Sequence, residues 1–175
     1  MFELSVDSGF CAAHAIPHER CGKLIVAIDE SEHARKAVPA AVELARAGGG
    51  TVQVLHVREL AYARATVVGD SPEEAQQLVD GVVEELKQAG VVAEGSVRTS
   101  TTGPARVILE HARDVEATMI VLGSRGLGAL AGLLLGSVAH KIIQLASCPV
   151  LVVRDEGSLD ERDHDVLRAQ TRFQA

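Results

Sequence analysis

Short apolar runs rich in β-branched residues alternate with segments of helical periodicity along most of the chain. Residues 24–28 read Leu-Ile-Val-Ala-Ile, a pattern typical of a strand buried on both faces. Similar runs occupy residues 51–57, 91–98, 118–122 and 149–154. Strands that alternate with helices pack as a parallel sheet with right-handed crossovers. The alternation therefore predicts an α/β fold, a three-layer sandwich in which helices cover both faces of an open five-stranded parallel sheet.

The helices between these strands have recognisable ends. Ser31 can cap a first helix that continues to the glycines at 48–50. A second helix has the clearest start, because Ser71 can cap it, Pro72 fits its first position and Glu74 completes a capping box. A third helix is predicted after Gly103-Pro104, and a fourth over residues 137–146.

Residues 23–154 contain this whole pattern and are predicted to form one domain. Residues 1–22 are then an N-terminal extension. Residues 155–175 form a polar tail that mixes acidic residues with arginine, and we expect it to be frayed or loosely helical.

Charge and hydropathy exclude several classes of function. The net charge is −7 and the basic residues are scattered, so a nucleic-acid partner is not expected. No apolar run approaches the roughly 20 residues that span a bilayer, and the first ten residues do not resemble a secretory signal. We therefore predict a cytoplasmic protein without a membrane partner. Three cysteines argue against a disulfide framework.

A glycine-rich stretch follows the fourth strand and leads into the fourth helix. In an open parallel sheet, ligands bind at the carboxyl ends of strands, where a glycine turn lets backbone N–H groups approach a phosphate. The stretch contains no Walker A string. Its Gly126-x-Gly128-x3-Gly132 lies after the fourth strand, whereas a dinucleotide fingerprint follows the first. A third motif, Gly-x2-Gly-x9-Gly-Ser, fits at every spacing, through Gly123, Gly126, Gly136 and Ser137.

With these residues the chain resembles the universal stress protein family of the ATP-binding type. The resemblance covers residues 23–154. It includes the strand ending in Asp29, the pair His56-Val57, Gly103-Pro104, and residues 119–126, 135–139 and 148–153. It implies a sheet with strand order 3-2-1-4-5, numbered along the chain. It also implies a homodimer that pairs the last strands, here Val150–Val153.

The resemblance further implies a nucleotide-binding site. Asp29 would bind the adenosine, and Ala27, Ile28 and Val57 would line the adenine pocket. The residues that would surround the ribose and phosphates are Gly123, Arg125, Gly126, Gly136, Ser137 and Val138. Leu122 also belongs to the predicted nucleotide-binding set. ATP is the expected ligand, with Mg²⁺ at its phosphates. Ala139 stands where family members often have a hydroxyl.

Other interpretations of the same residues stay open at this point. Asp29 could instead cap the first helix, and the glycines could serve only a tight turn. We interpret His56 as a packed strand residue rather than a catalytic base. The leading hypothesis is a nucleotide-dependent sensor or regulator in the stress response, without a catalytic residue. The alternatives are a dimeric interaction module without nucleotide, in which the leucines at 127–135 fill the pocket, and a slow ATPase.

The N-terminal extension contains Cys11, His14, His18 and Cys21, residue types that bind zinc. Residues 2–24 also resemble the opening of 6-pyruvoyl-tetrahydropterin synthase-like proteins, in which the matching His is a zinc ligand and the Cys is catalytic. The paired histidines expected after Leu24 are replaced by Ile25-Val26-Ala27. We therefore predict no metal site and assign the extension no activity.

Overall fold

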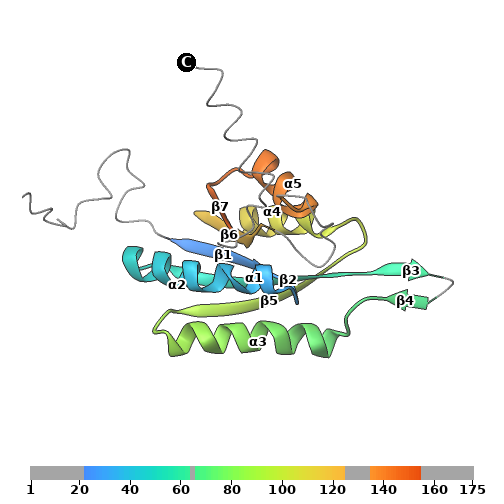
Figure 1. Cartoon of the computed structure of the whole chain (residues 1–175), viewed down its shortest axis with the longest axis horizontal. Coiled ribbons are helices and arrows are strands. Elements are labelled where there is room, and N and C mark those ends of the chain that lie inside the picture. Colours follow the sequence, from blue (N-terminus) through green and yellow to red (C-terminus); the bar gives the residue numbers. More distant parts are fainter. Residues whose placement is uncertain (1–21, 64–65, 125–134, 155–175) are drawn as a thin grey trace, which may run out of the picture.

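A five-stranded parallel sheet forms the centre of the molecule (Figure 1). The computed structural model describes residues 22–63, 66–124 and 135–154. The strands lie in the order β5-β2-β1-β6-β7. Their bounds are β1 Lys23–Ile28, β2 Thr51–Glu59, β5 Ala93–Ser100, β6 Met119–Gly123 and β7 Val150–Val153. Counting only these strands along the chain gives the order 3-2-1-4-5, which confirms the predicted sheet.

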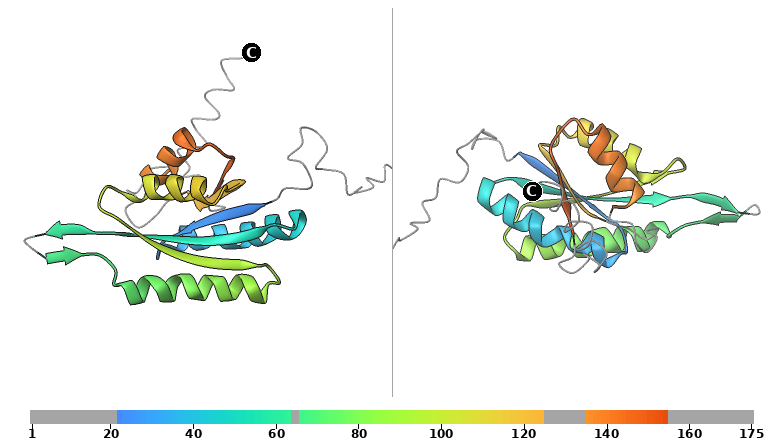
Figure 2. Two further views of the ribbon diagram at one scale, coloured as in Figure 1. Left: turned by 180° about the vertical axis from the view of Figure 1, so that it is seen from behind. Right: turned by 45° about the horizontal axis from the view of Figure 1, so that its top comes forward.

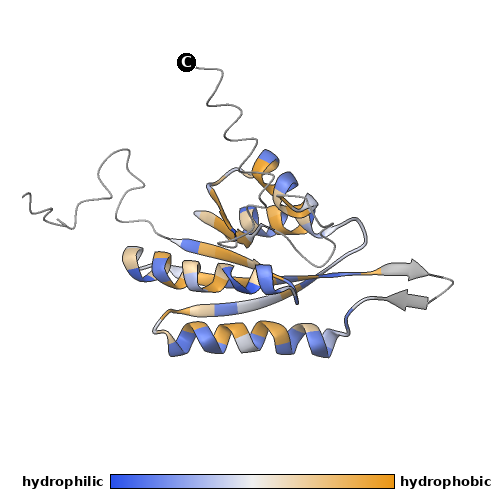
Figure 3. Ribbon diagram, in the orientation of Figure 1, coloured by the Kyte–Doolittle hydropathy of each residue, from blue (hydrophilic) through white to orange (hydrophobic). Residues whose placement is uncertain are grey.

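Helices cover both faces of the sheet (Figures 1 and 2). One face carries α1 (Glu32–Arg35), α2 (Ala37–Gly48) and α3 (Pro72–Gln88), and the other carries α4 (Pro104–Asp114) and α5 (Ser137–Leu145). Along β1, Leu24, Val26 and Ile28 belong to the core cluster on the α2 and α3 side, whereas Ile25 and Ala27 belong to the cluster on the α4 and α5 side. This alternation follows from the two-residue period of a strand. The apolar faces of the helices turn toward the sheet in Figure 3.

The first helix differs from its prediction, because the structure divides it in two at Lys36. Pro39 explains the division. Proline has no N–H to donate to the carbonyl four residues earlier, at Arg35, and its ring crowds that carbonyl. The chain therefore ends α1 at Arg35 and starts α2 at Ala37, so that Pro39 lies in a first turn, where it is tolerated.

A second difference follows β2, where sequence reasoning predicted no regular structure. The chain forms an antiparallel hairpin from β3 (Ala61–Ala63) and β4 (Thr66–Val68). The hairpin extends past the end of the central sheet, toward the right in Figure 1. It returns the chain to the capping box of α3, in which the Glu74 N–H donates to Ser71 Oγ at 3.1 Å and the Ser71 N–H donates to Glu74 Oε2 at 2.8 Å. This box confirms the predicted helix start.

Gly95 shows why a glycine interrupts the strand pattern of β5. A Cβ at this position would lie 2.3 Å from Val79 Cγ1 and 3.1 Å from Val83 Cγ2, both on α3. Val79 and Val83 are buried, so the missing side chain lets α3 pack directly on β5. Within the described ranges, no helix is long and apolar enough to cross a bilayer.

Candidate functional site

A cavity of about 1020 Å³ opens at the carboxyl ends of β2, β1 and β6 and is bordered by the first turns of α4 and α5. The register of the three strands makes its floor. Ala27 pairs with Leu55 on one side and with Leu122 on the other, and all three side chains belong to the core cluster on the α4 and α5 side. All three residues also line the cavity, so its floor is apolar. Such a floor suits the flat face of a nucleobase.

The structure brings together most of the residues that the resemblance to the family selects. The lining of the cavity includes Ala27, Ile28, Asp29, Val57, Leu122, Gly123, Gly136, Ser137 and Val138. Ile28 borders it by its main chain, because its side chain packs in the core cluster of the opposite face. Arg125, Gly126 and the leucines at 127–134 lie outside the described residues.

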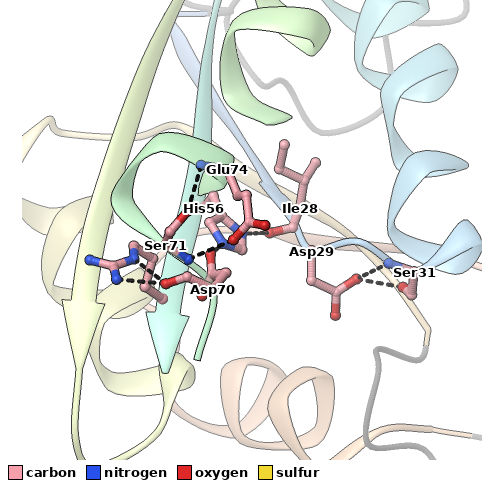
Figure 4. Close-up of polar contacts among 8 residues, drawn as sticks. Ile28, Asp29, Ser31, His56, Asp70, Ser71 and Glu74 are labelled. Atoms are coloured by element: carbon pink, nitrogen blue, oxygen red, sulfur yellow. Dashed lines mark hydrogen bonds and ion pairs between the residues drawn. The ribbon is translucent and has the colours of Figure 1, made fainter. Parts of the chain in front are cut away.

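Asp29 follows the last residue of β1 and organises the turn into α1. Its Oδ1 atom accepts hydrogen bonds from the Ser31 N–H at 2.9 Å and from Ser31 Oγ at 2.5 Å (Figure 4). Ser31 in turn caps α1, where its Oγ accepts from the Ala34 N–H at 3.2 Å. Asp29 therefore holds Ser31, the N-cap residue of α1, in place and is not the N-cap itself. This turn holds the carboxylate on the cavity wall.

The first turn of α5 supplies hydrogen-bond donors on the opposite wall. Gly136 donates its N–H to the Ser124 carbonyl at 2.7 Å, so this amide is engaged within the protein. The helical bonds begin with the His140 N–H, which donates to the Gly136 carbonyl at 2.9 Å. The amides of Ser137, Val138 and Ala139 thus precede the first helical bond. No acidic residue lies in this turn and no side chain caps it, so the positive end of the helix dipole is not neutralised locally.

Gly123, the first glycine of the motif, has a packing role in the structure. A Cβ at this position would lie 2.3 Å from the His33 carbonyl oxygen and 2.9 Å from the Ala34 nitrogen. Both atoms belong to the backbone of α1. The missing side chain therefore lets α1 approach the end of β6, which is a sufficient reason for glycine at this position.

A pair of titratable side chains, the buried His56 and the partly buried Asp70, was missed by sequence reasoning as a unit. His56 Nδ1 lies 3.0 Å from the Ile28 carbonyl oxygen, and its Nε2 lies 2.7 Å from Asp70 Oδ2 (Figure 4). The side chains are 6% and 19% exposed, and both residues border the cavity. The prediction for His56 named only a packed strand residue. Asp70 follows the unpredicted hairpin, so nothing in the sequence placed it beside His56.

Charges are distributed unevenly around the cavity. Acidic side chains gather near the ends of β1 and β2, at Asp29, Glu30, Glu59 and Asp70. The basic side chains of the lining come from α4 and α5, at Arg106, Arg113 and Lys141. Arg106 is paired with Glu110 at 2.7 Å. The α4 and α5 side therefore has the more positive field, on the same side as the first-turn amides of α5.

Metal-binding residues do not cluster in the part of the chain that the structure describes, where no group of three His, Cys, Asp or Glu side chains could hold an ion. The N-terminal candidates Cys11, His14, His18 and Cys21 lie outside it. Cys148 is half-buried as a free thiol, and burial raises its pKa.

Comparisons with known proteins agree on one family. The sequence model described as the universal stress protein family matches residues 21–154. The chain is 36% identical over 145 residues to universal stress protein YxiE of Bacillus subtilis, a match that covers 75% of this chain and 98% of that protein.

Solved structures with the same fold contain nucleotides. A universal stress protein from Archaeoglobus fulgidus in complex with dAMP is 27% identical, with a TM-score of 0.56 and coverage of 74% of this chain and 95% of that one. A family protein from Arabidopsis thaliana with AMP bound is 23% identical, with a TM-score of 0.55 and coverage of 78% and 93%.

Proposed function

The chain belongs to the universal stress protein family, and we propose that it binds ATP in the cavity at the carboxyl ends of β1, β2 and β6. One observation carries the proposal: one cavity is lined by an apolar floor, by a carboxylate at the end of β1 and by the first turn of α5, whose amides precede the first helical hydrogen bond. A nucleoside phosphate has a part that matches each of these features: a flat base for the floor, ribose hydroxyls for the carboxylate and an anionic phosphate chain for the amides. Relatives that hold dAMP and AMP support the class of ligand.

The uneven charge of the cavity suggests the orientation of the ligand. Phosphates point toward α5, where the amides of Ser137 and Val138 and the ammonium of Lys141 offer donors and positive charge. The adenosine lies toward β1 and β2, with the base on Ala27 and beside Val57, and the ribose hydroxyls at Asp29. In the opposite orientation the phosphates would face the carboxylates of Asp29 and Glu30.

Mg²⁺ would accompany the phosphates. This ion binds through phosphate oxygens, water and one or two carboxylates, so it does not need a cage made by the protein alone. The carboxylates of Asp29 and Glu30 lie on the adenosine side in this orientation, so phosphate oxygens and water would be the main ligands of the ion. Arg125 and Gly126 complete the proposed phosphate contacts, as the motif implies.

We further propose that the protein acts in the cytoplasm as a dimer whose partner contacts depend on the bound nucleotide. Residues 23–154 would be the nucleotide-binding unit, with residues 1–22 and 155–175 outside it. Strand β7 ends the sheet and has a neighbour only on its β6 side among the described strands. It exposes Leu151, and α5 beside it exposes Ile143 and Leu145. An apolar edge strand of this kind is protected when a second copy pairs with it.

Equilibrium dialysis of the full-length protein against millimolar ATP, with and without Mg²⁺, tests the proposed function. We expect saturable binding, which Ser137→Pro should weaken more for ATP than for adenosine. Proline at this first helical position is compatible with the helix but removes one of the first-turn N–H groups. Gly81→Ala, on the exposed face of α3, is a control outside the cavity. Absence of binding by the wild type would instead support the nucleotide-free interaction module, and ATP turnover that Ser137→Pro abolishes would support the slow ATPase.

A further inference from the structure

His56 and Asp70 together make a continuous hydrogen-bonded link from β1 to the start of α3. The link begins at the Ile28 carbonyl, passes through both ring nitrogens of His56, and ends at Asp70 Oδ2. Asp70 is held from its other side as well. Its carbonyl accepts two hydrogen bonds from Arg58, from Nε at 3.0 Å and from Nη2 at 2.6 Å. The next residue, Ser71, is the N-cap of α3.

The number of protons in this link follows from its chemistry. A carbonyl oxygen can only accept, so the hydrogen on the His56–Ile28 contact must be on Nδ1. Nε2 and Oδ2 are 2.7 Å apart, and one proton must lie between them, since two lone pairs at this distance would repel. The proton belongs either to an imidazolium or to a carboxylic acid. In both cases the ring is fixed with a hydrogen on Nδ1.

The His56–Asp70 link lies next to the part of the cavity that is proposed to hold the nucleoside. Ile28 is paired with His56 in the sheet register, and each is followed by a residue of the proposed site, Asp29 in one strand and Val57 in the other. A His56 ring that is held by Asp70 keeps the Ile28 carbonyl in place. It therefore fixes where the main chain turns toward Asp29. The first-turn amides of α5 lie across the cavity, beyond β6.

We propose that His56 and Asp70 are positioning residues for the nucleoside part of the ligand, a role that rests on the proposed function. Their paired side chains set the geometry of the Ile28–Asp29 turn and of Val57, and they make no contribution at the phosphates. Their removal lowers the affinity for adenosine, AMP and ATP by the same factor. The effect of the α5 amides, in contrast, grows with the number of phosphates.

Two substitutions at Asp70 distinguish this role from a simple need for negative charge. Asp70→Ala leaves Nε2 without a partner, so the Ile28–Asp29 turn must be ordered when the ligand binds. We expect this ordering to cost about as much as one net hydrogen bond, which corresponds to about a fivefold weaker affinity for each of the three ligands. Asp70→Asn removes the charge but can donate from its amide to the unprotonated Nε2 of a neutral ring. We expect it to restore binding to within about twofold of the wild type. Isothermal titration calorimetry with adenosine, AMP and ATP measures all three affinities.

Ser71→Ala is the matched control. It removes the cap of α3 one residue away and leaves the His56–Asp70 pair intact. It should lower stability by about 1 kcal/mol while the affinities stay the same. A loss of affinity in Ser71→Ala equal to that in Asp70→Ala would show that weakening the start of α3 is sufficient, and would overturn the proposal.

Each of the other possible results refutes either the proposed function or the positioning role. A wild type that binds none of the ligands refutes the proposed function. A wild type that binds while Asp70→Ala binds equally well refutes only the positioning role, as does an Asp70→Asn protein as weak as Asp70→Ala. Should Asp70→Ala fail to fold, ¹⁵N NMR of the His56 ring in the wild type takes its place. We expect a protonated Nδ1 and a ring signal that shifts when adenosine binds. An unprotonated Nδ1, or a ring signal that adenosine leaves unchanged, would contradict the proposal.

Discussion

Gly123→Ala should destabilise the protein through contact with α1. The added Cβ would lie 2.3 Å from the His33 carbonyl oxygen, 2.6 Å from the His33 carbonyl carbon and 2.9 Å from the Ala34 nitrogen. These are backbone atoms, so rotation of a side chain cannot relieve the contact. The short helix α1 must move away from β6 by about 1 Å to restore an ordinary van der Waals distance.

The size of the effect follows from overpacking. A group forced into a close-packed site costs about 1–3 kcal/mol. For a domain of this size, that loss corresponds to a fall in Tm of about 3–12 °C. Since Ser31 and Asp29 are hydrogen-bonded at the start of α1, the shift also disturbs the proposed ribose side of the cavity.

Urea denaturation followed by circular dichroism, with Gly81→Ala as the matched control, measures this loss. A Cβ at Gly81 meets no atom within 4 Å, and the residue lies inside α3. Glycine in a helix is less stable than alanine by about 0.5–1 kcal/mol, so the control should be more stable than the wild type. The reasoning is refuted if Gly123→Ala unfolds at the wild-type urea concentration while Gly81→Ala shows its gain.

Three further predictions concern other parts of the molecule. Burial and the nearby charge of Arg98 lower the pKa of His111, whereas Asp114 acts in the opposite direction. As the pH is lowered, His111 therefore takes up its proton at a higher pH in the unfolded chain than in the folded protein. The free energy of unfolding then decreases as the pH falls below about 6.5. The pH dependence of the urea midpoint should be shallower in His111→Leu, and an identical dependence would contradict this. Lys141→Ala should weaken ATP by up to about fivefold at low salt and leave adenosine unchanged, as measured by calorimetry; equal losses would contradict the proposed orientation. Leu151→Asp should shift the protein from dimer to monomer in light scattering, and a persistent dimer would exclude pairing through β7.

Local sequence signals predicted much of the sheet and the helix starts. The strand β1 is an unbroken apolar run because both of its faces are covered by helices. Ser71 and Glu74 indicate the start of α3, because a capping box is formed by residues close together in the sequence. The division at Lys36 was also accessible, since Pro39 is visible in the sequence. Helical periodicity alone concealed it, because the apolar positions continue across the break.

Contacts between distant segments were harder to predict. The clash that a side chain at position 123 would cause involves the backbone of α1, about 90 residues earlier in the chain, so the motif alone did not reveal this packing requirement. The pairing of His56 with Asp70 depends on a hairpin whose strands carry no clear turn signal. Such pairs are determined by the tertiary fold rather than by local spacing.

A crystal structure of the full-length protein grown with ATP and Mg²⁺ tests the central claim most directly. We predict electron density for the phosphates within hydrogen-bond distance of the Ser137 and Val138 amides, with the ribose at Asp29 and the base on Ala27. Density for the nucleotide elsewhere, or leucine side chains of residues 127–135 filling the cavity in its place, would contradict it.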